Sequence, residues 1–313
     1  MRLLLAELAK LRRPMTFGVA GAAALFCVLL AAGGARNASP AAQGAPGHLP
    51  SCAAAGVPAG PRCARWQADA RARQRQVAAD AAQVAAQLAP GAAGAEAAGL
   101  IASLPGALAI ALLAGAHIGG EWSGRTIKSL LTQHGRRGQV LAAKLVSLWL
   151  AGVSLIAACW APLALAGPAL ARANHLPAGR PAVLHGLSLS GTQAARALLV
   201  LAAFAVIGLL AAVLTRSATG TIAATAGTVI AMLAVAALPG AGAWTPATWV
   251  QAWMGFPAGL GSVTALPANF WSRFISAGGS PPGQGFGLAG LLALVAAGLT
   301  AAVLIFRRAD VGG

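Results

Sequence analysis

Six long apolar runs dominate this sequence, and each is close to the length of a membrane-spanning helix. A transmembrane helix needs about 20 predominantly apolar residues. The runs lie at 15–34, 100–118, 140–167, 195–214, 219–238 and 286–306. Only 9% of the 313 residues are charged, against about 25% in a soluble domain. We therefore expect an all-α membrane protein with six transmembrane helices, built as a single polytopic domain over 1–313.

The basic residues predict the orientation of these spans. The chain has 22 Lys and Arg against 6 Asp and Glu. The Lys and Arg residues are scattered between the apolar runs. This distribution is typical of membrane flanks and not of a nucleic-acid-binding surface. By the positive-inside rule, the short basic connections place both termini in the cytoplasm. The segments 35–99, 168–194 and 239–285 are then outside a bacterial cytoplasmic membrane. A cleaved signal peptide is the alternative interpretation of the first run.

The first 14 residues predict a cytoplasmic elbow helix before the first span. Leu4, Leu8 and Leu11 share one face of an amphipathic helix, and Pro14 suits the first position of the next helix. Such a helix lies on the inner membrane surface before the chain turns into the bilayer. The alternative is a basic flank that serves only as a topology signal.

The first outer segment, 35–99, is a large loop with a predicted helix at 64–89, rich in Ala, Gln and Arg. Cys52 and Cys63 both lie in this loop, on the side of the membrane where disulfides persist, so a bridge between them is a hypothesis. Cys27 and Cys159 lie in predicted spans, where packed thiols are expected. Neither pair has the spacing of a metal site.

The last outer segment, 239–285, carries an aromatic stripe. Trp249, Trp253 and Phe256 follow the i, i+4, i+7 spacing of one helix face. Tryptophans gather at the membrane interface, so we expect this segment to be extracytoplasmic and interfacial. A gate for a transported substrate is the alternative.

The connection 119–138 carries the most specific pattern in the chain. Ile127 and Leu130 share an apolar face of a short predicted helix, while Glu121 and Arg125 form an i, i+4 pair. This pattern predicts a helix across the cytoplasmic end of the bundle, with a polar side offered to a partner. A solvated loop is the alternative.

This connection resembles the cytoplasmic segment of ABC-2-type ABC transporter permeases. The residues that match the family pattern are Glu121, Trp122, Gly124, Lys128, Leu130, Leu131, Arg136, Arg137 and Lys144. The opening helix from Glu7 to Arg13 and the ending from Phe306 to Val311 also resemble the family. The loop 35–99 is longer than in the simplest members, so the resemblance implies no role for it.

The resemblance implies the permease subunit of an ABC exporter. It implies a second permease subunit, identical or sibling, and two ATPase subunits bound on the cytoplasmic side. In that reading Glu121, Arg125 and Lys128 are polar contacts to the ATPase. Trp122, Ile127 and Leu130 pack this coupling segment, and Lys10, Arg12 and Arg13 support the elbow helix.

The chain itself has no G-x-x-x-x-G-K-[ST] loop for a nucleotide phosphate. ATP and Mg would therefore be bound by the partner ATPase, and we expect no cofactor and no enzymatic activity in this chain. The expected contacts besides protein partners are with membrane lipid.

The fifth run carries three threonines at helical spacing. Thr221, Thr225 and Thr228 form a mildly polar stripe that either borders a translocation path or allows close helix packing. An uncharged path favours hydrophobic or amphipathic cargo.

Two other functions compete with the exporter. A non-transporting sensor or immunity protein would keep the ATPase contact. An intramembrane protease is the weaker rival, since Ser188-Leu189-Ser190-Gly191 lacks the first glycine of G-x-S-G and the pair His117 and Glu121 lacks a third metal ligand.

Overall fold

The structure is a computed structural model that describes residues 14–44, 51–124, 137–177, 183–236, 244–255 and 283–308, together with Ala9 and Leu238. Every regular element in this described part is an α-helix, which confirms the all-helical prediction. The elements are α2 (Pro14–Asn37), α3 (Pro61–Gln87), α4 (Ala93–Ala102), α5 (Leu104–Ser123), α7 (Arg137–Ala173), α8 (Val183–Thr215), α9 (Ala218–Ala236), α10 (Pro246–Met254) and α12 (Gln284–Arg308).

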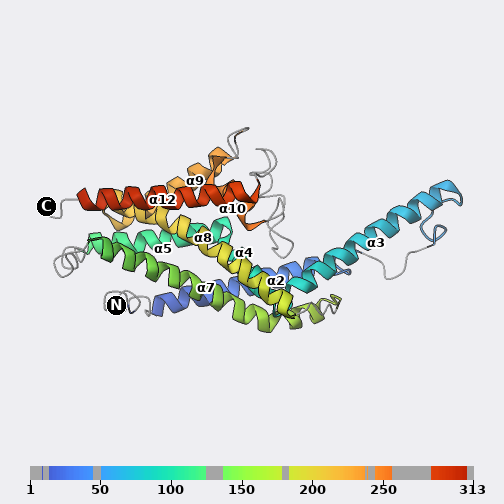
Figure 1. Cartoon of the computed structure of the whole chain (residues 1–313). Coiled ribbons are helices and arrows are strands. Elements are labelled where there is room, and N and C mark those ends of the chain that lie inside the picture. The colour runs from blue at the N-terminus through green and yellow to red at the C-terminus, as the bar shows by residue number, and fades with distance from the viewer. Residues whose placement is uncertain are drawn as a thin grey trace.

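The helices form an elongated bundle around α8 (Figure 1). α8 supplies the largest share of the main core, including Phe204 and Leu209, which are almost completely buried. α5 crosses it very closely at Gly208, where a Cβ atom would collide with the carbonyl oxygen of Ala111. This glycine therefore allows two apolar helices to meet backbone to backbone.

Four helices in the described part are long and apolar enough to cross a membrane. Their spans are Ala20–Asn37, Gly138–Ala173, Leu184–Thr215 and Gln284–Phe306. The pair Ala93–Ala102 and Gly106–Ser123, bent by 61°, makes a fifth if it is one broken span, and Ala218–Met232 is shorter. These apolar helices are consistent with a multi-pass helical membrane protein. The number of six spans stays a prediction.

The second predicted span is broken where the sequence analysis expected a continuous helix. The run 100–118 contains the boundary between α4 and α5, with Ser103 in an extended conformation. Pro105 lacks the backbone N–H that a continuing helix needs. A side chain at Gly106 would collide with the carbonyl oxygen of Ile101. The bend therefore follows from adjacent proline and glycine residues inside an apolar run.

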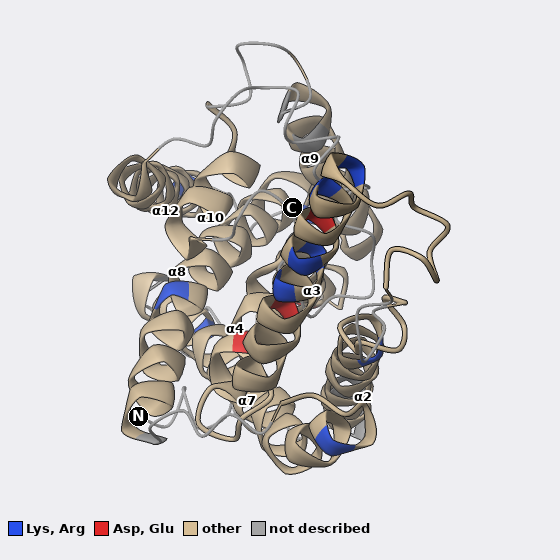
Figure 2. Cartoon of the chain, turned by 90° about the vertical axis from the view of Figure 1, so that its right-hand side faces the viewer, with Lys and Arg blue, Asp and Glu red and all other residues tan. Residues whose placement is uncertain are grey.

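α3 projects from one end of the bundle (Figure 1). Its last turns pack through Ala81, Val84 and Leu88 in a second, smaller apolar cluster with Ala31 and Ala35 of α2. None of its residues before Ala81 is buried. Figure 2 views the bundle from this end and shows basic and acidic residues along α3.

A disulfide joins Cys52 to Cys63, near the start of α3, with their Cα atoms 5.7 Å apart. It ties the chain that leads into α3 to the first turn of this helix. Cys27 on α2 and Cys159 on α7 are free thiols, and both are buried.

The bundle has two chemically distinct ends. α2 begins, α5 ends, α7 begins, α8 ends and α12 ends at one of them, as Figure 1 shows. We call it the ion-pair end, after Glu121 and Lys144, and the opposite end the α3 end. Lys144, Arg216 and Arg308 lie at the ion-pair end, whereas Arg36 and Arg172, in the last turns of α2 and α7, lie at the α3 end, so the orientation in the membrane stays a prediction.

Candidate functional site at the ion-pair end

A buried ion pair joins the end of α5 to the start of α7. Lys144 Nζ lies 2.6 Å from Glu121 Oε2, and these side chains are only 2% and 11% exposed. Among the described residues, Lys144 has the largest fully buried side chain. A buried charge is costly unless it is paired, so the two residues hold each other in place.

Trp122 links this ion pair to two other parts of the bundle. Its ring meets Phe306 of α12 edge to face, with centroids 6.2 Å apart. Its second partner is Arg216, which lies between α8 and α9. The guanidinium carbon of Arg216 lies over the Trp122 ring, 5.6 Å from the ring centroid. Its buried Nε1–H has no hydrogen-bond partner among the described residues.

The turn from α8 into α9 is fastened to the same place. Arg216 adopts a left-handed backbone conformation with φ 50°, which is uncommon for a residue other than glycine. The N–H of Ala218 donates to Ser123 Oγ at 2.9 Å. These contacts bring the ends of α5, α8 and α12 and the starts of α7 and α9 into one cluster.

The cluster connects the helices that precede and follow the connection 125–136. Glu121 comes before this connection in the sequence and Lys144 after it, so their ion pair joins α5 directly to α7. Through Trp122 and Ser123 the same cluster contacts the end of α12 and the turn between α8 and α9. Among the described residues, no group of three His, Cys, Asp or Glu side chains is placed to hold a metal ion.

The predicted coupling residues divide into two groups. Glu121 and Trp122 lie in the cluster. Arg125, Ile127, Lys128 and Leu130 fall outside the described residues, as do Lys10, Arg12 and Arg13 of the elbow helix. Glu121 is buried against Lys144, whereas the sequence analysis expected an exposed polar contact. Sequence spacing suggested Arg125 as its partner, and nothing local pointed to a residue 23 positions away.

The three predicted path threonines do not share one environment. Thr221 and Thr225 are completely buried. They face α5, where a Cβ at Gly119 would lie 2.7 Å from Thr221 Oγ1 and one at Gly115 would lie 3.4 Å from Thr225 Oγ1. Thr228 is exposed and donates to the Ala224 carbonyl at 2.7 Å. Within one chain, Thr221 and Thr225 thus mediate close packing of α5 on α9, and a path role for the stripe stays a prediction.

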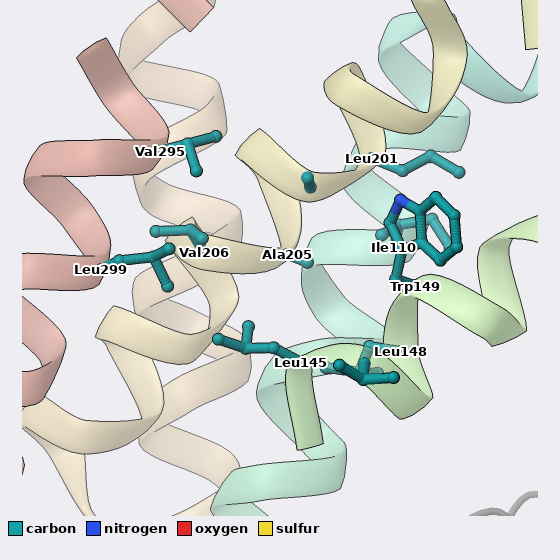
Figure 3. A pocket seen from close by; sticks show the side chains of 11 residues that line it. Ile110, Leu145, Leu148, Trp149, Leu201, Ala205, Val206, Val295 and Leu299 are labelled. Carbon is teal, nitrogen blue, oxygen red and sulfur yellow. The ribbon is translucent and has the colours of Figure 1, made fainter. Parts of the chain in front are cut away.

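An apolar pocket of about 240 Å³ lies between α5, α7, α8 and α12 (Figure 3). Its side chains come from all four helices, and Trp149 and Val146 at α7 are partly exposed. The lining residues are Ile110, Leu145, Val146, Leu148, Trp149, Leu201, Ala202, Ala205, Val206, Val295 and Leu299. None of them is charged, so the pocket suits an apolar group.

Ser190 has a packing role in the structure. Its hydroxyl donates to the Gly91 carbonyl at 2.6 Å and accepts from the N–H of Ala95 at 3.1 Å. These bonds fasten α8 to the start of α4. The hydroxyl is therefore engaged in helix packing, and the geometry gives the protease interpretation no support.

Trp249 and Trp253 of α10 are partly buried and contact neighbouring helices. The Trp249 ring lies against Gly290 of α12, where a Cβ atom would collide with it. Trp253 packs beside Arg196 of α8, and its Nε1–H donates to the Arg196 carbonyl at 3.1 Å. Trp249 and Trp253 thus fasten α10 to its neighbours, while Phe256 lies outside the described residues.

Comparison with known proteins gave no match. No protein-family model, no curated protein and no solved structure matches this chain.

Proposed function

We propose that this chain is the permease subunit of a bacterial ABC exporter, driven by ATP that a separate ATPase subunit hydrolyses. The observation that carries the proposal is the cluster of Glu121, Lys144, Trp122, Arg216 and Phe306. It joins five helix ends at once, and two of these are the end of α5 and the start of α7, which flank the connection 125–136 that resembles the coupling segment of such permeases. A push from a partner on that connection would move the bundle as a unit.

In this proposal the predicted coupling residues have two different roles. Glu121 is a positioning residue, because its carboxylate is engaged with Lys144 inside the bundle. Trp122 is also a positioning residue. The direct contact to the ATPase is then left to Arg125 and Lys128.

The interior supports an apolar or amphipathic cargo. The pocket between α5, α7, α8 and α12 is lined without a charged side chain. Small ions usually require charged or polar groups along their route, and an uncharged pocket favours compounds that partition into lipid. The cargo would reach such a pocket from the bilayer itself.

The test is recovery of the full chain from its own membranes under mild detergent. We expect an ATPase with a G-x-x-x-x-G-K-[ST] loop to copurify, and Arg125→Glu to lower both its recovery and cargo-stimulated ATP hydrolysis. A charge reversal at an interface opposes the partner directly. Arg172→Glu is the matched control, since Arg172 is an exposed arginine in the last turn of α7 at the opposite end.

Absence of such an ATPase from the purified complex would contradict the proposal. Equal recovery with Arg125→Glu and Arg172→Glu would remove the coupling role of the connection. ATPase binding without any transport would instead favour the non-transporting sensor.

A further inference from the structure

Arg196 marks one boundary of the apolar part of α8. The next charged residue is Arg216, twenty positions later, and Ala197 to Thr215 contains no charge. At about 1.5 Å per residue this stretch is about 30 Å long, which equals the thickness of the bilayer hydrocarbon core. Arg196 therefore sits at the level of the lipid headgroups at the α3 end.

Three helices hold the Arg196 side chain in place. Its guanidinium carbon lies 5.5 Å from the Trp253 ring centroid of α10. Gln284, the first residue of α12, lies beside the guanidinium. We assign its amide so that the oxygen faces Arg196, because that orientation accepts from Nη1 and Nη2, each at 3.0 Å. Arg196 itself is only partly exposed. The guanidinium is thus positioned. It has five N–H groups, of which Gln284 accepts two, and no other described residue is recorded as accepting from the rest.

Among the described residues, no carboxylate neutralises this charge. Within the described residues, no carboxylate lies within the 4.0 Å of an ion pair with Arg196. Glu121 is engaged with Lys144 at the opposite end, and Asp69 and Asp80 are exposed on α3. Glu96 of α4 forms no ion pair with Arg196.

The remaining sequence offers no other counter-charge. The segment 256–282, which follows α10, contains neither Asp nor Glu. Glu7 and Asp310 stand in the sequence before α2 and after α12, whose adjoining ends lie at the ion-pair end. An arginine near the end of a span reaches the lipid headgroup region, where lipid phosphates can serve as its counter-ion.

We infer that Arg196 binds the phosphate group of an anionic phospholipid, with Trp253 and Gln284 as positioning residues. A planar guanidinium pairs with phosphate through two parallel N–H bonds. Lipid phosphates lie at the depth that α8 assigns to Arg196. The site is independent of the proposed transport function, because it lies at the opposite end of the bundle from the coupling segment.

The experiment measures lipid binding to the full chain in a neutral detergent by native mass spectrometry. The probes are phosphatidylglycerol and a diacylglycerol with the same acyl chains but no phosphate. The variants are Arg196→Gln, Arg196→Lys and the matched control Arg172→Gln, an exposed arginine at the same end. A separate arm adds sn-glycerol 3-phosphate, which carries the phosphate without acyl chains.

We expect the wild type and Arg172→Gln to bind one phosphatidylglycerol about tenfold more tightly than diacylglycerol. A charge-assisted hydrogen bond contributes a gain in affinity of about this size. Arg196→Gln should remove this preference. Arg196→Lys keeps the charge but loses the two-pronged geometry, so its preference should be intermediate while its melting temperature stays that of the wild type.

Three results would overturn the inference. The first is an unchanged preference in Arg196→Gln, or in folded Arg196→Lys if the glutamine variant does not fold. The second is equal binding of the two lipids by the wild type. The third is displacement of phosphatidylglycerol by an equal concentration of sn-glycerol 3-phosphate, which would assign the site to a soluble phosphate compound.

Discussion

Lys144 and Glu121 are 23 positions apart in the sequence, and their side chains meet at 2.6 Å inside the bundle. Everything between them is the end of α5, the connection 125–136 and the first turns of α7. The ion pair therefore joins α5 to α7 within two turns of the ends that flank this connection. In the proposed exporter, coupling through the connection would depend on this contact.

We predict that Lys144→Met destabilises the protein more than an ordinary surface substitution. Removal of one partner leaves the other charge buried and uncompensated, which costs about 3–5 kcal/mol. The double variant Lys144→Met/Glu121→Gln should recover much of this loss, because no charge is then left buried. Thermal unfolding in detergent measures both effects.

Arg172→Met serves as the control for the lysine substitution, since it also removes a cation from α7 but at an exposed position. Equal melting temperatures for Lys144→Met and Arg172→Met would contradict the importance of the pair. Purely additive effects in the double variant would show that the two residues act independently.

Gly208→Ala is predicted to loosen the contact between α5 and α8. A Cβ atom at this position would collide with the Ala111 carbonyl oxygen and lie 2.9 Å from the Gly115 backbone nitrogen. Backbone atoms cannot rotate away, so the helices must separate, at a cost of about 1–3 kcal/mol. Gly227→Ala on α9 meets no atom within 4 Å and should be neutral or slightly stabilising. Melting temperatures that rank the two variants in the opposite order would refute this packing.

The Cys52–Cys63 bridge is predicted to have a local effect. In native membranes both thiols should resist alkylation until a reductant is added, whereas Cys27 and Cys159 should react only after denaturation, because they are buried. A short bridged loop contributes roughly 2–3 kcal/mol. Since the first half of α3 contacts neither apolar cluster, Cys63→Ser should increase proteolysis near the start of α3 and leave the melting of the bundle unchanged. Rapid labelling of Cys52 without reductant would argue against the bridge.

Cysteines placed at the two ends of the bundle should label from opposite sides of the membrane. Ala173 ends α7 at the α3 end, Thr219 begins α9 at the ion-pair end, and both are exposed. We expect a membrane-impermeant maleimide to reach Ala173→Cys in intact cells and Thr219→Cys only after the membrane is opened. Labelling of Thr219→Cys in intact cells would reverse the orientation derived from the basic flanks.

The positions of the helices were predictable from the sequence, because apolar runs of span length dictate them. Each of the six runs coincides with helical structure, although α7 and α8 extend beyond the predicted ends. The break between α4 and α5 was not predicted. Pro105 and Gly106 are the residues that indicate a break. They lie inside an apolar run whose hydropathy predicted one continuous helix.

The candidate site was only half predictable. The family pattern included Glu121, Trp122, Lys144 and Phe306, but it did not indicate that they contact one another or that Arg216, between α8 and α9, joins them. Such contacts depend on how helices pack, which the 3.6-residue period of a single helix does not encode. For the same reason the stripe of Trp249 and Trp253 identified a helix face but not its contacts with Gly290 and Arg196, and the interfacial position of this segment stays a prediction.

The projecting part of α3 is a lever. The stretch from Pro61 to Asp80 is free of the bundle and about 30 Å long, while the anchored turns from Ala81 to Leu88 span only about 12 Å. A sideways force on the disulfide-tied tip therefore acts on the anchored turns through a long arm, and the contacts there must resist a larger force. This force falls on α2 through Ala31 and Ala35, and on α7 through Leu88, which lies against Gly167. Whatever touches the tip thus acts mechanically on two helices of the bundle.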